Sequence, residues 1–400
     1  MIFPTGYYRI HPDVSMNFQM NRWFGWVGEP DMLREMRVIA PRIRNYPDWK
    51  REFLALAEHA SREGKVLRGG YYYRAAEFFM MADDLDRTFA RENFLDAVRT
   101  AHGLTTIRRH AIPYVEGGVD GFLPAYRFTP DKHRGTIVFF GGFDSYIEEL
   151  MPFFCGLRDA GHEIVAFEGP GQGGALNEGK LPMSPDWHKP VGAVLDYFGL
   201  DAVTLCGLSL GGCLVIRAAA FEARVHRVIA YDILADFFDV NLGQLTLSKR
   251  VFLKLLLDLR AAPLVNALVW QVAASSPVID WGIHHGMHVT GTATPHDYLR
   301  KLRRFHTRDV SARIKQDVLL MAGNEDHFVP LRQFYRQIEA LVGARSITAR
   351  LFTRSESAQN HCQVGNYGLA LATIVNWLDS MQARGHGVGS PERETAQASN

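Results

Sequence analysis

Cysteine is scarce in this sequence of 400 residues, which has four, at positions 155, 206, 213 and 362. Three of them lie in apolar segments, and their spacing fits neither a disulfide framework nor a set of zinc ligands. No apolar run approaches the ~20 residues that a membrane-spanning helix needs. The N-terminus also has no basic segment followed by an apolar one, as a signal peptide would. These absences predict a protein of a reducing, cytoplasmic compartment that is not bound to a membrane.

Charge of either sign is not concentrated anywhere in the chain. Lys and Arg number 44, Asp and Glu number 43, and the formal net charge is +1. Without a run of like charges, nothing in the sequence predicts a nucleic-acid partner or an anionic membrane surface. The hydrophobic content of 47% is ordinary for a globular enzyme. We therefore look for the function in local motifs.

The most informative stretch covers residues 203–220, VTLCGLSLGGCLVIRAAA. A short apolar run predicts a buried strand, Gly-Leu-Ser-Leu-Gly follows at 207–211, and small apolar residues then predict a buried helix. Strand, sharp turn and helix are the context of a nucleophile elbow, which presents a serine above the sheet. The sequence therefore predicts that Ser209 is a nucleophile, with the positive end of the following helix aimed at it.

A serine nucleophile needs a base, and the base needs a carboxylate to orient it. In this architecture the residues follow the order serine, acid, histidine. Asp326 comes just after an apolar strand and before a helix that begins at a proline, and we favour it as the acid over its neighbour Glu325. His361 follows the last expected strand and is the expected base.

Two backbone N–H groups are expected to stabilise the oxyanion that forms during attack on a carbonyl. One belongs to Leu210, which directly follows the nucleophile. The other comes from the loop after the strand at 136–140, where two glycines allow a close approach and Phe143 is the expected donor.

Strands and helices alternate from residue 107 onward, which predicts a mostly parallel, eight-stranded α/β sheet covered on both faces. We divide the chain into a helical N-terminal domain (1–106), a sheet domain (107–383) and a polar tail expected to be disordered (384–400). About eighty residues separate the expected strands at 228–231 and 318–321, far more than an ordinary connection. We interpret residues 233–315 as a helical lid.

Two further groups of residues receive mainly structural interpretations. Gly-Pro-Gly-Gln-Gly at 169–173 lacks the Lys-Ser/Thr ending of a phosphate loop, so we expect a turn beside the elbow. Glu168, just before it, is a possible functional carboxylate, although a structural role is favoured. His284 and His288 would face one way if they lay on a helix, but no carboxylate or further histidine is placed to complete a metal site. We expect neither a metal nor a cofactor.

Taken together, these motifs resemble one branch of the α/β-hydrolases. It contains the fermentation-respiration-switch-like proteins, 2,6-dihydroxypseudooxynicotine hydrolase and the fungal pigment hydrolases that shorten polyketides. The resemblance covers nearly the whole chain and is carried by YYRAAEFF at 72–79, GGFDS at 141–145 with Glu148 and Glu149, EGPGQG at 168–173, the elbow, Asp326 and Asn-His-Cys at 360–362.

The resemblance implies an α/β-hydrolase fold with a helical N-terminal domain that closes over the site, and often a homodimer. It also implies cleavage of carbon–carbon bonds in ketones. Relatives can carry an extra functional carboxylate after the strand that ends near Tyr231, and Asp232, Asp236 and Asp239 are all candidates. The branch often has Asp where this chain has Glu168.

The expected function is a serine hydrolase with the triad Ser209, Asp326 and His361, acting on a small aromatic or polyketide-like ketone. Carbon–carbon cleavage would proceed by retro-Claisen acyl hydrolysis. A carboxylesterase or lactonase with the same triad is an open alternative. A non-hydrolytic binding protein or a cyclase on the same fold is another.

Overall fold

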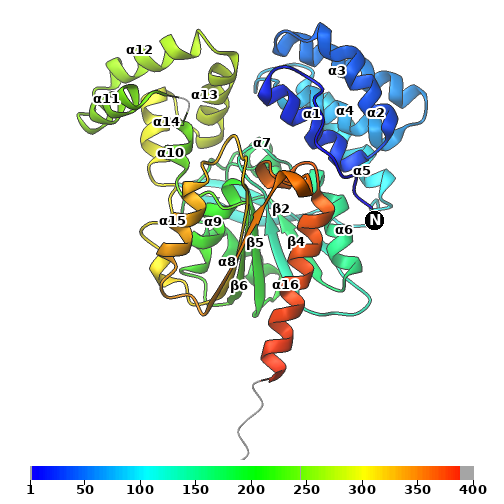
Figure 1. The fold of residues 1–400 in the computed structure, drawn as a ribbon, viewed down its shortest axis with the longest axis vertical. Coiled ribbons are helices and arrows are strands. Elements are labelled where there is room, and N and C mark those ends of the chain that lie inside the picture. The colour runs from blue at the N-terminus through cyan, green and yellow to red at the C-terminus, as the bar shows by residue number, and fades with distance from the viewer. Residues whose placement is uncertain (1, 244, 388–400) are drawn as a thin grey trace, which may run out of the picture.

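A single sheet of eight strands forms the centre of the protein (Figure 1). The computed structural model describes residues 2–243 and 245–387. The strands follow the order β1-β2-β4-β3-β5-β6-β7-β8, in which β2 is antiparallel to both of its neighbours and all other pairs are parallel. The strands are β1 His110–Glu116, β2 Val119–Phe128, β3 Thr136–Phe140, β4 Glu163–Phe167, β5 Val203–Leu208, β6 Val225–Tyr231, β7 Asp317–Gly323 and β8 Ser346–Phe352.

Helices cover both faces of the sheet, which therefore separates two hydrophobic cores. One core joins alternate strand residues such as Phe139 to α6 (Met151–Asp159) and α16 (Tyr367–Gly387). The other joins the intervening residues, such as Val138, to three helices. These are α8 (His188–Phe198), α9 (Leu210–Ala219) and α15 (Arg332–Ala340). The central strands β3, β4 and β5 are buried along their whole length, as parallel strands covered on both faces must be.

In the described part of the chain, five α-helices precede the first strand. They are α1 Val14–Val27, α2 Pro30–Ile39, α3 Tyr46–Arg62, α4 Val66–Phe78 and α5 Arg87–Ala101. Aromatic side chains of α1, α3 and α4, among them Trp23, Trp49 and Tyr71, are fully buried and continue the core on the α6 and α16 side of the sheet. The sequence pattern predicted α3 to α5 but left residues 1–45 unassigned, so α1 and α2 are additions to the expected fold.

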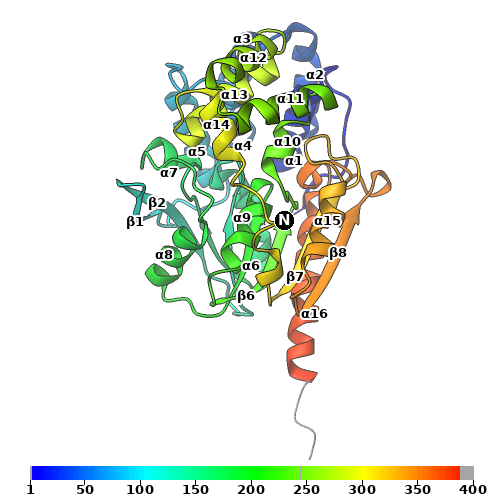
Figure 2. The same ribbon diagram turned by 90° about the vertical axis from the view of Figure 1, so that its left-hand side faces the viewer.

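A second group of helices lies between β6 and β7, where the lid was expected. It consists of α10 Phe237–Asn241, α11 Leu247–Asp258, α12 Ala262–Ala273, α13 Pro277–Thr290 and α14 Pro295–Leu302. Hydrophobic periodicity predicted α11, α12 and α14, whereas α10 and α13 were not expected. Figures 1 and 2 show this group and the N-terminal helices above the same end of the sheet.

The last helix, α16, continues to Gly387, beyond the point where the disordered tail was expected to begin. The rest of that expected tail, residues 388–400, lies outside the described residues. All four cysteines are buried and unpaired. Among the described residues, no helix is both long and apolar enough to cross a bilayer.

Candidate active site

Ser209 stands at the sharp turn between β5 and α9. Its backbone has φ 60° and ψ −119°, a conformation that residues other than glycine rarely adopt. The Ser209 N–H donates to the Tyr231 carbonyl oxygen at 2.8 Å, and the Ser209 carbonyl oxygen accepts from the Gly212 N–H at 2.7 Å. The turn is therefore fixed from both sides.

Three glycines around Ser209 allow this turn to pack tightly. A Cβ on Gly207 would lie 2.1 Å from the Gly211 carbonyl oxygen, and one on Gly212 would lie 2.1 Å from the Asp232 carbonyl oxygen. A Cβ on Gly211 would lie 2.7 Å from the Gly141 carbonyl oxygen. Because these obstacles are all backbone atoms, they have little room to move, and only glycine fits at the three positions.

The structure brings Ser209, His361 and Asp326 together, although they follow three different strands. The Nε2 atom of His361 lies 2.8 Å from Ser209 Oγ, and its Nδ1 lies 2.6 Å from Asp326 Oδ2. The second carboxylate oxygen of Asp326 accepts from the N–H groups of Phe328 and Val329, at 2.7 and 2.9 Å. The three residues predicted to be nucleophile, base and orienting carboxylate thus form one series of hydrogen bonds.

The neighbouring carboxylate, Glu325, lies elsewhere. It is exposed and pairs with the Arg354 guanidinium at the surface. The side chain of Asp326, by contrast, is only 2% exposed. Of the two acids weighed from the sequence, the geometry therefore puts Asp326 beside His361.

The electrostatic surroundings of His361 favour the charged form of its imidazole. Burial by itself disfavours the charged form, but the Asp326 carboxylate outweighs it and raises the pKa of His361 well above its ordinary value. Burial likewise opposes ionisation of Asp326, yet the facing imidazole and the hydrogen bonds hold the pKa of this carboxyl below its ordinary value. Asp326 therefore stabilises an imidazolium once His361 has accepted a proton.

The loop after β3 lies directly on the elbow. A Cβ on Gly142 would come within 2.9 Å of Ser209 Cβ and 3.2 Å of the Leu210 backbone nitrogen. Phe143 follows this glycine, and Leu210 is the first residue of α9, where N–H groups have no partner within the helix. Neither N–H makes a hydrogen bond among the described residues. The two expected oxyanion donors thus belong to adjoining segments.

Asp232 is the one candidate of the three carboxylates after β6 that reaches the triad. It is 1% exposed, and its Oδ2 lies 3.9 Å from His361 Nδ1 and accepts from the Cys362 N–H at 3.1 Å. Burial and the nearby Asp326 charge raise the pKa of Asp232 to about 8. It therefore carries a proton at neutral pH and lies behind the histidine, outside the cavity described below.

The other candidate carboxylates have structural partners. Asp236 caps the N-terminus of α10 by accepting from the Asp239 N–H, and Asp239 forms an ion pair with Arg332 at 2.6 Å. Glu168 is buried and accepts from the backbone N–H groups of Ile147 and Gly174. Burial and the neighbouring Glu148 raise the pKa of Glu168 to about 7. None of the three lines the cavity beside Ser209.

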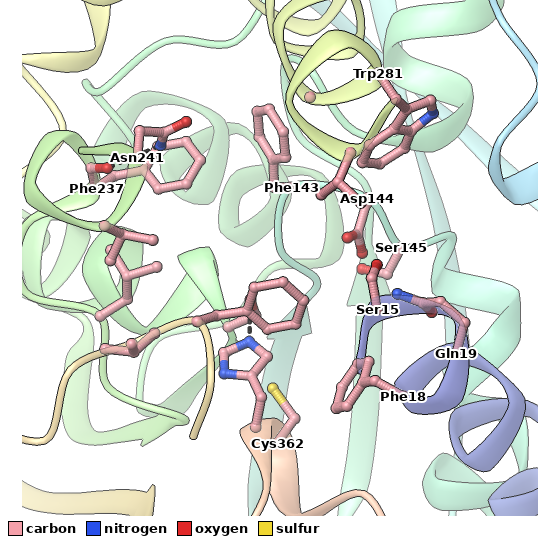
Figure 3. Close-up of a pocket in the computed structure, with 18 of the residues that line it drawn as sticks. Ser15, Phe18, Gln19, Phe143, Asp144, Ser145, Phe237, Asn241, Trp281 and Cys362 are labelled. Carbon is pink, nitrogen blue, oxygen red and sulfur yellow. Dashed lines mark hydrogen bonds between the residues drawn. The ribbon is translucent and has the colours of Figure 1, made fainter. Parts of the chain in front are cut away.

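That cavity has a volume of about 300 Å³ and a mostly apolar wall. Its wall comes from the turn at Ser209, the loop after β3, the helices between β6 and β7, and α1. Figure 3 shows Phe18 of α1, Phe143, Phe237 and Trp281 around the open space. Ser209 and His361, whose Oγ and Nε2 atoms lie 2.8 Å apart, also line the cavity. The site therefore sits between the two helical groups and the edge of the sheet.

One side of the cavity is polar. Ser15, Gln19, Asp144 and Ser145 point toward one another in Figure 3, and Arg22 also lines the wall there. The Arg22 guanidinium lies 3.1 Å from Asp144 Oδ1 and 2.6 Å from Glu149 Oε2. Its positive charge helps to hold the pKa of Asp144 below the ordinary value despite burial, so this carboxyl is ionised.

Sequence reasoning did not single out this polar group. Asp144 follows the expected oxyanion donor directly, so its position in the motif was the available signal. Ser15, Gln19 and Arg22 belong to a helix that the pattern did not reveal, and no local signal marks them.

Asp232, His361 and Cys362 could offer metal-ligand atoms within 4.8 Å of one another. Both ring nitrogens of His361 are already engaged, with Asp326 and Ser209. His284, on the exposed side of α13, contacts Asp280 on its own helix. We therefore assign no metal site to either group.

No protein-family model matches the chain. Its curated relatives are fungal hydrolases. Hydrolase LUC6 from Fusarium sp is 27% identical, with 93% of this chain and 97% of the relative aligned. The 20-hydroxy-prefusarin hydrolase FUS2 from Gibberella moniliformis is 28% identical, with 91% of this chain and 96% of the relative aligned.

The fold is also similar to that of the solved 2,6-dihydroxy-pseudo-oxynicotine hydrolase. The TM-score is 0.57 at 20% identity, and 92% of this chain and 95% of the other are covered. The predicted α/β-hydrolase fold is confirmed, as is the resemblance to this branch. The chain is therefore a hydrolase with the α/β-hydrolase fold.

Proposed function

We propose that this protein is a serine hydrolase that uses Ser209, His361 and Asp326 to cleave an acyl group from carbon. The observation that carries the proposal is the hydrogen-bonded chain from Ser209 Oγ through the His361 ring to Asp326, with separations of 2.8 and 2.6 Å. Each residue has the partner that its step requires.

The reaction begins when His361 Nε2 takes the proton of the Ser209 hydroxyl and the oxygen attacks the substrate carbonyl carbon. The N–H groups of Leu210 and Phe143 bind the resulting oxyanion. Collapse of this intermediate breaks the bond to the leaving group, which takes the proton from the His361 imidazolium. Water, deprotonated by the now neutral His361, then attacks the acyl-enzyme and releases a carboxylic acid.

We propose further that the leaving group is carbon, in a retro-Claisen cleavage of an aromatic or polyketide-type ketone. A carbon leaving group must depart as a stabilised carbanion, such as an enolate or an electron-rich aryl ring. The mostly apolar cavity between α1 and the helices α10–α14 supports this, because it keeps water away from the carbanion until His361 can protonate it. FUS2 and the solved neighbour are named after hydroxylated compounds, 20-hydroxy-prefusarin and 2,6-dihydroxy-pseudo-oxynicotine.

The two sides of the cavity suit an amphipathic substrate. Aromatic side chains such as Phe143 and Phe237 offer contact to an apolar ring or chain. The ionised Asp144 has its second carboxylate oxygen available to a substrate hydroxyl, since Arg22 contacts only the first. This arrangement favours a hydroxylated arene ketone over a plain hydrocarbon ester.

A carboxylesterase or lactonase is the second candidate function, because the same three residues would serve an ester equally well. A non-hydrolytic binding protein or a cyclase is the third. The three differ in what happens to Ser209 and to the products. A binding protein does not react with a fluorophosphonate at Ser209, and a cyclase releases no separate acid.

The deciding experiment compares an acylated polyhydroxyarene, an aryl β-diketone and a plain alkyl ester, with products identified by mass. We expect higher kcat/KM for at least one ketone than for the ester, with an acid and the deacylated carbon fragment as products. Ser209→Ala is the matched control for each. Faster turnover of the ester than of every ketone, with no carbon–carbon cleavage product, would overturn the retro-Claisen proposal in favour of the esterase.

A further inference from the structure

The side chain of Gln172 joins the turn after β4 to the loop after β3. Its Nε2 donates to the carbonyl oxygens of Gly141 and Gly142, at 2.7 and 3.0 Å. Its Oε1 accepts from the Gly169 N–H at 3.0 Å. Because Gly169 offers a donor and the other two residues offer acceptors, only one orientation of the amide satisfies all three bonds. Gln172 is 2% exposed, so water cannot replace these bonds freely.

These bonds determine which way the loop's N–H groups point. In a trans peptide, the carbonyl oxygen of one residue and the N–H of the next point in opposite directions. Holding the Gly141 carbonyl toward Gln172 turns the Gly142 N–H away from it, and that N–H donates to Ser145 Oγ at 3.1 Å. Holding the Gly142 carbonyl turns the Phe143 N–H away in the same manner. That N–H is the expected oxyanion donor.

The loop needs such a restraint because of its composition. Glycine has access to both signs of φ, so a peptide unit between Gly142 and Phe143 rotates more easily than one between two larger residues. If this peptide unit rotated, the Gly142 carbonyl oxygen, which carries a partial negative charge, would point into the oxyanion hole in place of the Phe143 N–H. It would then repel the oxyanion that the site has to stabilise.

We propose that Gln172 is a positioning residue that keeps the Gly142–Phe143 peptide in the orientation required by the oxyanion hole. This inference rests on the proposed function, since it presupposes that Ser209 forms a tetrahedral adduct. Gln172 does not line the cavity, so its side chain is not placed to contact a substrate bound there. It acts through the loop alone, and it gives the Gly-Pro-Gly-Gln-Gly turn a role beyond packing.

The first test is Gln172→Met, which keeps the length of the side chain and removes all three hydrogen bonds. Phenylboronic acid, which adds to the serine as a charged tetrahedral adduct, measures the oxyanion hole. Acetophenone, bound without a covalent bond, measures the cavity. We expect kcat for 4-nitrophenyl acetate and the affinity for the boronic acid to fall together by about 10²- to 10³-fold. The inhibition constant of acetophenone should change less than twofold.

Gln333→Met is the matched control. Gln333 is also 2% exposed, and its amide likewise bonds three backbone groups, in Ala235 and Asp236, outside the cavity. The Gln333→Met variant should be less stable than the parent, but its affinity for phenylboronic acid should not fall more than its affinity for acetophenone. Equal losses for boronic acid and acetophenone in Gln172→Met, or no loss for either, would overturn the proposal.

Gln172→Glu supplies an independent measurement that also applies if the methionine variant does not fold. An ionised glutamate repels both glycine carbonyls, whereas a protonated one can donate to one of them. The activity of this variant relative to the parent should therefore rise as the pH falls from 8 to 5. A constant ratio would contradict the proposal. Failure of the proposed function looks different, because the parent itself would then bind no boronic acid at Ser209.

Discussion

The ring of Phe18 lies 6.4 Å from the ring of His361, measured between their centroids. Phe18 belongs to α1, near the start of the chain, and its ring also meets that of Phe328 edge-on at 5.4 Å. The first helix is therefore part of the wall beside the triad and not a remote scaffold. Substrate binding should consequently respond to changes in α1.

Replacing Phe18 by alanine should weaken substrate binding without disabling the nucleophile. Loss of the ring removes apolar contact worth about 1.5–3 kcal/mol, so KM for an aryl ketone should rise roughly 10- to 100-fold. Fluorophosphonate labelling of Ser209 should change little. Phe89→Ala on α5, where the ring is 52% exposed, is the control. An unchanged KM in Phe18→Ala would show that the substrate does not reach α1.

Ser209→Ala should abolish turnover and leave the fold intact. The hydroxyl is the attacking group, and loss of a triad member costs several orders of magnitude in kcat. Circular dichroism and thermal unfolding should match the parent, because alanine occupies the same turn with one atom fewer. Residual activity above ~1% of the parent would rule out Ser209 as the nucleophile.

Asp326→Asn should lose most of kcat, whereas Glu325→Gln should behave like the parent. The asparagine cannot stabilise the imidazolium, and without the carboxylate charge the pKa of His361 falls. The acid limb of the pH profile of kcat/KM should therefore move to lower pH in Asp326→Asn. Glu325 pairs with Arg354 at the surface and serves as the adjacent control. If Glu325→Gln lost more of kcat than Asp326→Asn, Glu325 would be the acid that orients His361 and Asp326 would not.

Gly142→Ala should reduce kcat sharply by pushing the β3 loop off the elbow. The added Cβ would meet the Leu208 carbonyl oxygen and Ser209 Cβ, each at 2.9 Å, and neither is the flexible end of a side chain. We expect a loss of about 10²-fold or more in the rate of Ser209 acylation. Gly192→Ala on α8, whose nearest contact would be 3.4 Å, is the control. Equal acylation rates in both variants would contradict the placement of this loop.

Asp232→Asn should change how stability depends on pH. The folded protein keeps the Asp232 proton up to about pH 8, whereas an unfolded aspartate loses it near 3.8. Between these values the folded state binds more protons, so this residue's contribution to the free energy of unfolding falls as the pH rises. The difference in free energy of unfolding, variant minus parent, should therefore increase as the pH rises from 5 to 8. Parallel pH curves for the two proteins, measured by urea unfolding, would refute this.

The parts of the fold that the sequence predicted well are those with a local signal. The elbow joins a short apolar strand to a helix of small residues, and the strands β3 to β5 are short, mostly apolar segments. Asp326 and His361 stood out because they lie in the loops that follow the last two strands, β7 and β8. Their hydrogen bonds depend only on the strand ends meeting at one edge of the sheet.

Other parts could not be predicted because burial removes the usual pattern. In α1, the polar residues Asn17, Gln19 and Asn21 are buried together with Trp23 and Phe24, so the helix has no polar face to reveal its period. In α13, Gly282 and Gly286 interrupt the apolar pattern; at Gly286 a Cβ would strike the ring of Tyr298. The contacts of Gln172 join two loops and likewise leave no trace in either segment.

The division of the sheet into two cores has a consequence for how such enzymes diversify. The groups proposed to react are held by strand ends, whereas much of the cavity wall comes from two separate segments, α1 and the insertion α10–α14, each packed mainly into its own core. The N-terminal helical group and the insertion meet where Trp281 stacks on Phe78 and contacts Phe79 edge-on. If these three rings are kept, either segment can be exchanged with little effect on the core that supports the other. Recombining N-terminal helices from one relative with the insertion of another should yield folded chimeras that share one chemistry but accept different molecules.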